Sequence, residues 1–238
     1  MSEKVSVNSE IARLQRVIVH HPDAGISRIS PRRSEELLFD DIVFLEKMQE
    51  EHTQFLNILN FFLGEENVME TESLLKEALD NSNGGKEELL KHIISFEEAP
   101  TKYKTILEQM SHDKLAEVLI SGYNPQEDLY MFDPIPNFIF TRDIAVTVKD
   151  HVIITKAAKQ ARQRENFLTR FIFHWHPHFK KLRDQDRIIN LNLIDQFPPS
   201  RLGEKVSIEG GDMMILTEDF LLVGTSERTS DHAFETIK

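Results

Sequence analysis

The strongest limit on the fold comes from two short apolar stretches, 145–148 and 151–155, which only two residues separate. Such a pattern is typical of a β-hairpin. From 161 to 175 the apolar residues recur every three or four positions, which indicates a helix. A third apolar stretch, 187–194, then predicts another strand. The order strand, strand, helix, strand places the chain in the α/β class.

The same kinds of element are expected near both ends of the chain. Residues 13–22 predict a strand that Pro22 stops, and a helix follows, with Asp40 or Asp41 as its N-cap and Gly64 at its end. Residues 212–224 predict a second hairpin, turning at 217–219. A last helix then begins at a cap formed by Ser230 or Asp231. Repeated ββαβ-like units follow from this order.

The segment from about 71 to 122 differs from its surroundings, because it is rich in Leu, Lys and Glu and carries no strand pattern. Its helical periodicity, interrupted by the helix-breaking stretch "NSNGGK" and by Pro100, predicts four short helices, at 71–80, 86–96, 101–110 and 112–121. Ser111 is the expected cap of the last one. We interpret this segment as a helical insertion between sheet-forming parts.

Composition limits the partners. The 238 residues carry a formal net charge of -12, and they include no cysteine. A surface for nucleic acid or for an anionic membrane would need a basic patch, so neither partner is expected. No apolar stretch has the length of a membrane span or of a signal peptide. By default we expect a cytoplasmic protein.

Candidate site residues lie in two stretches that end or begin strands. The stretch "PNFIFTRD" brings Asn137 and Asp143 to the mouth of the first hairpin, and "IEGGD" places Glu209 and Asp212 around two glycines. A carboxylate held at such a position matches a planar guanidinium, because the two groups can share parallel hydrogen bonds. The alternative for both stretches is purely structural: an ion pair with a nearby arginine, or a capped turn.

Two arginines stand at predicted helix starts, Arg162 in "ARQRE" and Arg228 in "SERTS". The helix dipole is unfavourable for a cation there, so each could instead bind an anion such as an α-carboxylate, or remain a solvated surface residue. The spacing of His174, His176 and His178 resembles a metal site, but Pro177 interrupts the segment and no carboxylate completes the set. We therefore expect no metal.

Together these stretches resemble the arginine deiminases, a family of the guanidine-modifying (pentein) superfamily. The resemblance rests on six stretches that occur in the family's order: "NSEIARLQRVIVHHP", "ELLFDDIVFLEKMQEEH", "PIPNFIFTRD", "RQRE", "IEGGD" and "VGTSERTS". It implies a pentein-type α/β propeller of ββαβ units, incomplete here, with an inserted small helical bundle. The implied domains are 1–68 and 127–238, both of propeller units, with the helical insertion at 69–126.

The resemblance also implies a chemistry, the hydrolysis of L-arginine to L-citrulline and ammonia through a cysteine thiouronium intermediate, with no cofactor. It assigns Asp143 and Glu209 to the guanidinium clamp, with Glu209 also in proton transfer. Residues that match those holding the α-amino and α-carboxylate end are Asn137, Arg162 and Arg228, and Phe140 matches a pocket residue. Asp212 is expected to support the loop of Glu209.

This sequence departs from the family pattern in its catalytic residues. It contains no cysteine to act as nucleophile, and covalent catalysis of this kind needs the thiolate. The family's histidine belongs to an HxD motif after the "SERT" stretch, but His232 is followed two residues later by Phe234. By itself the chain is therefore expected to be inactive.

Three readings remain open at this point. The chain is part of an arginine deiminase-like hydrolase, or a non-catalytic module that binds or senses a guanidino compound, or a structural protein whose acids are caps and ion pairs. Under the first two, the partner is L-arginine or a related small molecule. Self-association as a homo-oligomer, or docking of a C-terminal partner segment, is a further expectation because an incomplete propeller leaves sheet edges open.

Overall fold

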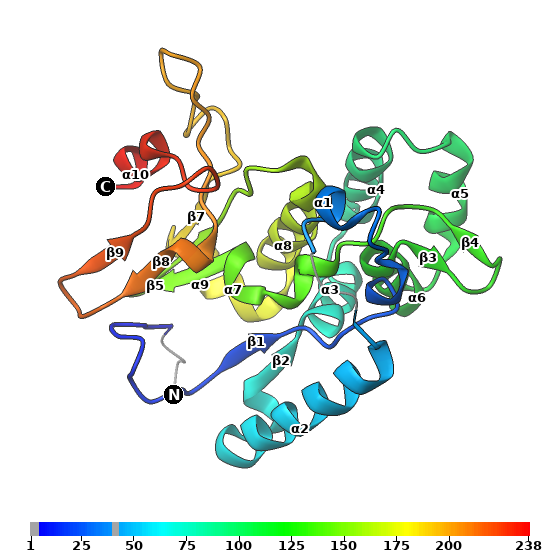
Figure 1. Ribbon diagram of the computed structural model, residues 1–238, viewed down its shortest axis with the longest axis horizontal. Coiled ribbons are helices and arrows are strands. Elements are labelled where there is room, and N and C mark those ends of the chain that lie inside the picture. The colour runs from blue at the N-terminus through cyan, green and yellow to red at the C-terminus, as the bar shows by residue number, and fades with distance from the viewer. Residues whose placement is uncertain (1–4, 40–42) are drawn as a thin grey trace. The chain divides into compact units, whose positions relative to one another are not determined.

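The computed structural model describes residues 5–39 and 43–238 and shows an α/β protein whose strands form small open sheets (Figure 1). The chain divides into two compact units. The first unit comprises 1–13, 141–170 and 178–238, and the second comprises 14–140 and 171–177. No helix among the described residues is both long enough and apolar enough to cross a bilayer.

The first unit contains the predicted hairpin and the strand after it. Strand β5 (Ala145–Val148) pairs antiparallel with β6 (His151–Ile154), and β7 (Ile188–Asn190) lies parallel to β6 on its other edge. Helix α8 (Gln163–Trp175) connects β6 to β7 in sequence. Lys149 takes a positive φ of 52° in the two-residue turn, as tight hairpin turns require. The predicted strand–strand–helix–strand order is confirmed here.

The second predicted hairpin is also present, in the same unit. Strand β8 (Met213–Ile215) pairs antiparallel with β9 (Leu221–Val223), and α10 (Asp231–Ile237) follows. Ser230 caps this helix, accepting a hydrogen bond from the Ala233 amide. Of the two predicted caps, Ser230 is therefore the correct one.

A buried apolar cluster joins the two hairpins of the first unit. Its fully buried members come from both hairpins, from the loops around them and from α10: Val146, Ile153, Leu191, Val206, Ile208, Met213, Ile215 and Ala233. Three of the hairpin strands contribute residues two positions apart, Val146 with Val148, Met213 with Ile215, and Leu221 with Val223, as side chains alternate along a strand. The cluster therefore fixes the loops at the strand ends, where the candidate site lies.

The second unit begins with a parallel pair of strands. Strands β1 (Val17–Val19) and β2 (Val68–Glu70) are joined by α2 (Leu45–Leu63). Gly64 ends this helix with a φ of 83°, as predicted. Asp40 and Asp41 lie outside the described residues, and the N-cap position of α2 is Phe44, so the predicted cap of this helix was wrong.

Four helices follow β2 in the second unit, close to their predicted limits. They are α3 (Thr71–Asp80), α4 (Gly85–Phe96), α5 (Thr101–Gln109) and α6 (His112–Ser121). Helix α3 packs against α6, and α4 packs against α5. Ser111 occupies the N-cap position of α6, but its side chain makes no capping hydrogen bond.

Several short elements were not predicted. They are α1 (Ser34–Leu37), the strand pair β3 (Tyr123–Asn124) and β4 (Leu129–Tyr130), the 3-10 helix η3 (Pro136–Ile139), α7 (Thr141–Ile144) and α9 (Lys180–Asp184). Elements of two to five residues are too short to show a period. Two of them, η3 and α7, carry candidate site residues.

A buried histidine holds the second unit together at the ends of β1 and β2. The His20 ring, 1% exposed, lies 3.0 Å from a carboxylate oxygen of Glu70 and 3.1 Å from one of Asp23. Burial on its own would lower the pKa of His20, but the hydrogen bonds to Asp23 and Glu70 raise it to about 9. The ring also lies 5.1 Å from that of Phe138 in η3.

We predict that the protein loses stability at alkaline pH, because His20 loses its charge there. The pKa is 6.5 in the unfolded chain and about 9 in the folded one. The stabilisation is therefore complete below pH 6.5 and is lost as the pH rises through 9. Replacing His20 by Gln should lower the free energy of unfolding by up to about 3 kcal/mol near neutral pH, and the deficit should narrow above pH 9. Urea unfolding of both proteins, between pH 6.5 and above pH 9, measures this difference in the free energy of unfolding.

The matched control is His112→Gln. His112 also contacts a carboxylate, that of Asp80 at 2.7 Å, but this pair lies at the surface. Exposed pairs contribute little to stability, so this variant should follow the wild type at every pH. Burial raises the pKa of nearby Glu72 to about 7, and that titration should persist in both variants. A His20→Gln deficit that does not change with pH would contradict the prediction.

Candidate functional site

Asp143 lies on the short helix α7, and its neighbour Arg142 binds that helix to the stretch around Gly210 and Met213. The Arg142 guanidinium donates to the Gly210 carbonyl at 3.2 Å and to the Glu10 carboxylate at 2.7 Å, and it also donates to the Met213 carbonyl. These bonds tie α7 to the start of the second hairpin. Arg142 therefore does not neutralise Asp143. The ion pair with a nearby arginine, which was the structural alternative, is present, and its arginine is Arg162.

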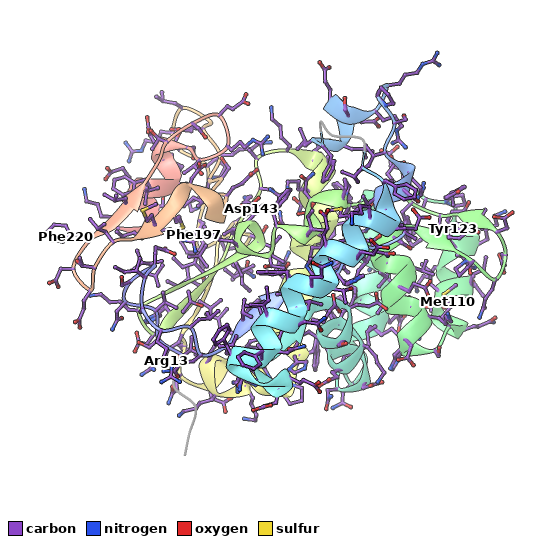
Figure 2. The ribbon with its side chains drawn as sticks, turned by 60° about the horizontal axis from the view of Figure 1, so that its bottom comes forward. Arg13, Met110, Tyr123, Asp143, Phe197 and Phe220 are labelled. Carbon is purple, nitrogen blue, oxygen red and sulfur yellow. The ribbon has the colours of Figure 1, made fainter. Side chains whose placement is uncertain are left out.

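Asp143, labelled in Figure 2, contacts the glycine corner. One of its oxygens accepts a hydrogen bond from the Gly211 amide at 3.0 Å, and the other accepts from Arg162 Nη1 at 2.9 Å. The Thr155 hydroxyl donates to the backbone carbonyl of Asp143 at 2.5 Å. The carboxylate is thus oriented by two loops and remains partly accessible, with its side chain 20% exposed.

Glu209 approaches the same arginine from the "IEGGD" corner. Its Oε2 accepts from Arg162 Nη1 at 3.1 Å and from Arg228 Nη1 at 3.2 Å. Its amide donates to the Thr229 hydroxyl at 3.2 Å. The residue is 4% exposed, and its Oε1 is buried with no hydrogen-bond partner. A buried carboxylate oxygen without a partner is costly, and Oε1 of Glu165 in the same cluster also has none.

Arg162 lies between these acids and a third one. Its guanidinium is 2% exposed, and it contacts Asp143, Glu209 and, at 2.9 Å, Glu165. Burial opposes its charge, but the three carboxylates raise the pKa of Arg162 above its ordinary value. Burial raises the pKa of the Glu165 carboxyl to about 7, although Arg162 acts in the opposite direction.

Glycine at position 210 lets the two acids approach each other. A Cβ atom there would overlap the Arg142 carbonyl oxygen, and it would lie 2.5 Å from a methyl group of Val146. A Cβ at Gly211 would lie 2.9 Å from Oδ1 of Asp143. The Gly-Gly pair is therefore required for close packing of α7 against the corner, which explains its position between Glu209 and Asp212.

Arg228 and Asp212 complete this side of the cluster. The Arg228 side chain is 42% exposed, so one face of its guanidinium reaches solvent while Nη1 holds Glu209. Asp212 accepts a hydrogen bond from the Thr229 hydroxyl at 2.6 Å, and the same hydroxyl accepts from the Glu209 amide. Asp212 thus supports the Glu209 loop through Thr229.

The two remaining predicted residues lie in the second unit. Asn137 is buried in η3 and donates to the Leu37 carbonyl at 2.8 Å. Phe140, 48% exposed, stacks on Phe39 with ring centres 6.4 Å apart. Their assignment to the substrate site stays a prediction.

Sequence reasoning missed two members of the cluster, Glu165 and Thr229. Glu165 follows Arg162 by three residues, a helical spacing that brings side chains together, so the ion pair could have been found. The link from Thr229 to Asp212 spans 17 residues across a hairpin, and no local pattern reveals it. The histidine segment has a structural explanation, because His176 contacts Glu77 at 3.0 Å.

Comparison with known proteins identifies the family of this chain. A sequence model described as "Arginine deiminase" matches residues 35–124 and 120–238. The chain belongs to the arginine deiminase family. Curated relatives include arginine deiminases of Listeria monocytogenes serotype 4a (strain HCC23) and serovar 1/2a (strain EGD-e), each 33% identical and matched over the whole chain. The chain spans 59% of the length of these relatives.

Solved structures give a weaker likeness. An adduct of dimethylarginine dimethylaminohydrolase with S-methyl-L-thiocitrulline superposes with a TM-score of 0.46 at 12% identity, covering 94% of this chain and 56% of that one. An adduct of dimethylarginine dimethylaminohydrolase with 4-chloro-2-hydroxymethylpyridine gives a TM-score of 0.45 at 13% identity, covering 94% and 54%. Assignment to the family therefore rests on the sequence comparison.

We predict a large difference between the two arginines of the cluster. Replacing Arg162 by Met leaves buried carboxylates without their cation, which should lower the free energy of unfolding by about 3–5 kcal/mol. Arg228→Met removes a half-exposed pair and should cost about 1 kcal/mol or less. Urea unfolding at neutral pH measures both, and equal losses would show that Arg162 does not hold the cluster together.

We also predict that Gly210→Ala is strongly destabilising, because the new methyl group overlaps the Arg142 carbonyl. The loss should be about 2 kcal/mol or more, as for other overpacked sites. Gly224→Ala is the matched control, because a Cβ there meets only the Asp212 carbonyl oxygen at 3.9 Å. Thermal unfolding that is alike for both variants would contradict the close packing of the corner.

Proposed function

We propose that the chain carries the guanidinium-binding part of an arginine deiminase-type hydrolase, which converts L-arginine and water to L-citrulline and ammonia. Membership of the family supports the reaction class, and the ion-pair cluster of the first unit supports the site. The proposed substrate is a small molecule with a guanidino group, and no cofactor takes part in the proposed reaction.

One observation carries the proposal. Asp143 and Glu209, which lie 66 positions apart in the sequence, converge on a single guanidinium nitrogen, Arg162 Nη1, at 2.9 and 3.1 Å. Two carboxylates already held at hydrogen-bonding distance from one guanidinium can clamp a second one with their remaining lone pairs. The unpartnered Oε1 of Glu209 is the acceptor to which such a ligand would bind.

The charge of the cluster favours a cation. Asp143 and Glu209 contact the guanidinium groups of Arg162 and Arg228, and Asp212 lies behind Glu209, where it accepts from the Thr229 hydroxyl. Glu165 adds further negative charge when it ionises near its pKa of about 7. A guanidinium ligand would balance this added charge in a site that is largely removed from water.

The geometry suggests different roles for the two arginines that the family resemblance assigns to the α-carboxylate. Arg228 is half exposed, so it can hold Glu209 and still bind a ligand carboxylate. Arg162 is enclosed by three acids, a position that suits alignment of the clamp better than contact with a ligand anion. We propose that Asn137 and Phe140 contact the rest of the substrate, as the resemblance implies.

The proposed reaction needs a nucleophile from outside this sequence, which contains no cysteine. A thiolate forms a bond to the guanidinium carbon, and the C–N bond breaks as ammonia takes up a proton and leaves. Water then displaces the thiolate and gives citrulline. The carboxylates stabilise the cationic substrate and its intermediate, and Glu209 also transfers protons. No step of bond breaking is assigned to the residues of this chain alone.

The absence of cysteine also favours a second candidate function, a module that binds a guanidino compound without turning it over. This candidate uses the same clamp and the same ligand. The two functions differ only in what happens once a thiolate reaches the bound guanidinium, so one series of experiments can separate them.

We predict that the chain binds L-arginine, with heat measurable by calorimetry at millimolar ligand. Removing one charged acceptor, by Asp143→Asn or Glu209→Gln, should weaken binding by at least about tenfold. Asp195→Asn is the control, because this acid is exposed in a turn of the first unit. Agmatine, which lacks the α-carboxylate, should bind more weakly than L-arginine, and Arg228→Gln should remove that difference.

Binding that is unaffected by Asp143→Asn and Glu209→Gln would refute the clamp. To separate the two functions, the chain is combined with the part of the Listeria arginine deiminase that it does not span, and citrulline is measured. Citrulline that depends on Asp143 supports the hydrolase. Binding with no citrulline, when the intact Listeria enzyme is active in the same assay, supports the non-catalytic module.

A further inference from the structure

Different acids hold the two sides of the Arg162 guanidinium group. Arg162 ends the 3-10 helix η4 (Gln160–Arg162), and α8 begins at the next residue. Its Nη1 contacts the two acids of the clamp, Asp143 at 2.9 Å and Glu209 at 3.1 Å. On the opposite side, Nε donates to Glu165 Oε2 at 2.9 Å, and Nη2 lies 2.9 Å from the same oxygen. Glu165 therefore sets the direction in which Nη1 points.

The start of α8 keeps Glu165 beside Arg162. The two residues are three positions apart, a spacing that places side chains on one face of a helix. Both side chains are enclosed, at 2% exposed for Arg162 and 1% for Glu165. The Thr169 hydroxyl donates to the Glu165 backbone carbonyl at 2.8 Å. The carboxyl group is thus held against the guanidinium and away from water.

Among the three acids that contact Arg162, Glu165 has the least compensation for its charge. Asp143 is 20% exposed and also accepts from a backbone amide. Glu209 contacts the guanidinium groups of both Arg162 and Arg228. Glu165 is enclosed, and while its Oε2 lies against Arg162, its Oε1 has no hydrogen-bond partner. Glu165 is therefore the acid of this cluster for which the neutral form costs least.

The surroundings of Glu165 favour uptake of a proton near neutral pH. Burial raises the pKa of Glu165 to about 7, although Arg162 acts in the opposite direction, and the charges of Asp143 and Glu209 raise it further. These three residues, on η4, on α7 and at the glycine corner, are the charged groups that act on it most strongly. A proton on Oε1 breaks no hydrogen bond, because that oxygen accepts none.

The proton on Glu165 changes the charge that the clamp offers to a ligand. With Glu165 ionised, three carboxylates contact the guanidinium groups of Arg162 and Arg228, so negative charge exceeds positive charge among these groups. With Glu165 neutral, the two arginines match the charges of Asp143 and Glu209. Charges interact strongly where water is excluded, so a guanidinium ligand should bind the ionised form more tightly.

We propose that Glu165 is a positioning residue that makes ligand binding by the guanidinium clamp depend on pH. It acts through Arg162. The ionised carboxylate holds Nε and Nη2, so that Asp143 and Glu209 keep negative charge for the ligand. Protonation weakens this hold and leaves Arg162 to neutralise the two clamp acids. The inference rests on the proposed clamp and adds a form of regulation to it.

Calorimetry with L-arginine at about pH 6 and about pH 8, on either side of the pKa of about 7, measures this dependence. Wild-type affinity should be at least about fivefold higher at the higher pH, the low end of the usual coupling between two sites. Because binding and proton release are linked, titrations in two buffers of different ionisation enthalpy should show release of protons on binding. Methylguanidine, which has no other titrating group in this range, should show the same dependence.

Three variants identify the residue responsible. Glu165→Gln keeps the shape of the side chain but remains neutral, so it should bind L-arginine equally at both pH values, with the wild-type affinity of the lower pH. Glu165→Asp retains a carboxylate and should keep the pH dependence. Glu227→Gln is the matched control, because Glu227 also lies near a cation, Lys159 at 3.8 Å, but is 77% exposed. This control should behave like the wild type.

A second measurement needs no ligand. The side-chain carboxyl carbon of Asp143 is followed by nuclear magnetic resonance from about pH 5 to about pH 9. Its signal should shift in a step centred near pH 7, because Arg162 links Asp143 to Glu165. The step should be absent in Glu165→Gln and present in Glu227→Gln. If Glu165→Gln does not fold, the wild-type step and proton release, with the Glu165→Asp variant, still decide the outcome.

Equal wild-type affinity at both pH values, a pH dependence that survives Glu165→Gln, or an Asp143 signal without the step would each overturn the proposal. Loss of the dependence in Glu227→Gln would point to a general effect of charge and would also contradict it. Failure of the clamp itself gives a different result. In that case L-arginine binds at neither pH, or its binding is unaffected by Asp143→Asn, and both proposals are then refuted.

Discussion

The buried guanidinium of Arg162 is the interaction on which the arrangement of the first unit depends. It joins Asp143 on α7 and Glu209 at the glycine corner, which are distant in the sequence, to Glu165, which follows Arg162 by three residues on α8. A buried cation with three anionic partners is stable only while all of them remain in place. The same interaction that fixes the fold here therefore fixes the geometry of the proposed clamp.

The support for this centre comes from both hairpins. The glycine corner packs against α7 because Gly210 has no side chain to meet the Arg142 carbonyl, and Arg142 in turn binds the Gly210 carbonyl. Behind the corner, Thr229 joins Glu209 to Asp212. Oε1 of Glu209 is buried at this corner and has no hydrogen-bond partner.

The two hairpins of the first unit differ in how their strands are covered. Strand β6 has neighbours on both edges and buried side chains on both faces. Strand β9 has one neighbour in the described chain and an apolar face in solvent.

Sequence alone determined the α/β class, both hairpins, the four helices between 71 and 122, and every acid and arginine of the cluster except Glu165, because period, turn residues and charge type are local properties. It did not determine α7, the Phe44 cap position or the role of Thr229, since these depend on a few residues each. Only the tertiary structure decided that Arg162 pairs with Asp143 and Glu209 at once. Such a contact requires both hairpins and the start of α8 to meet around one buried charge, and no sequence spacing encodes that meeting.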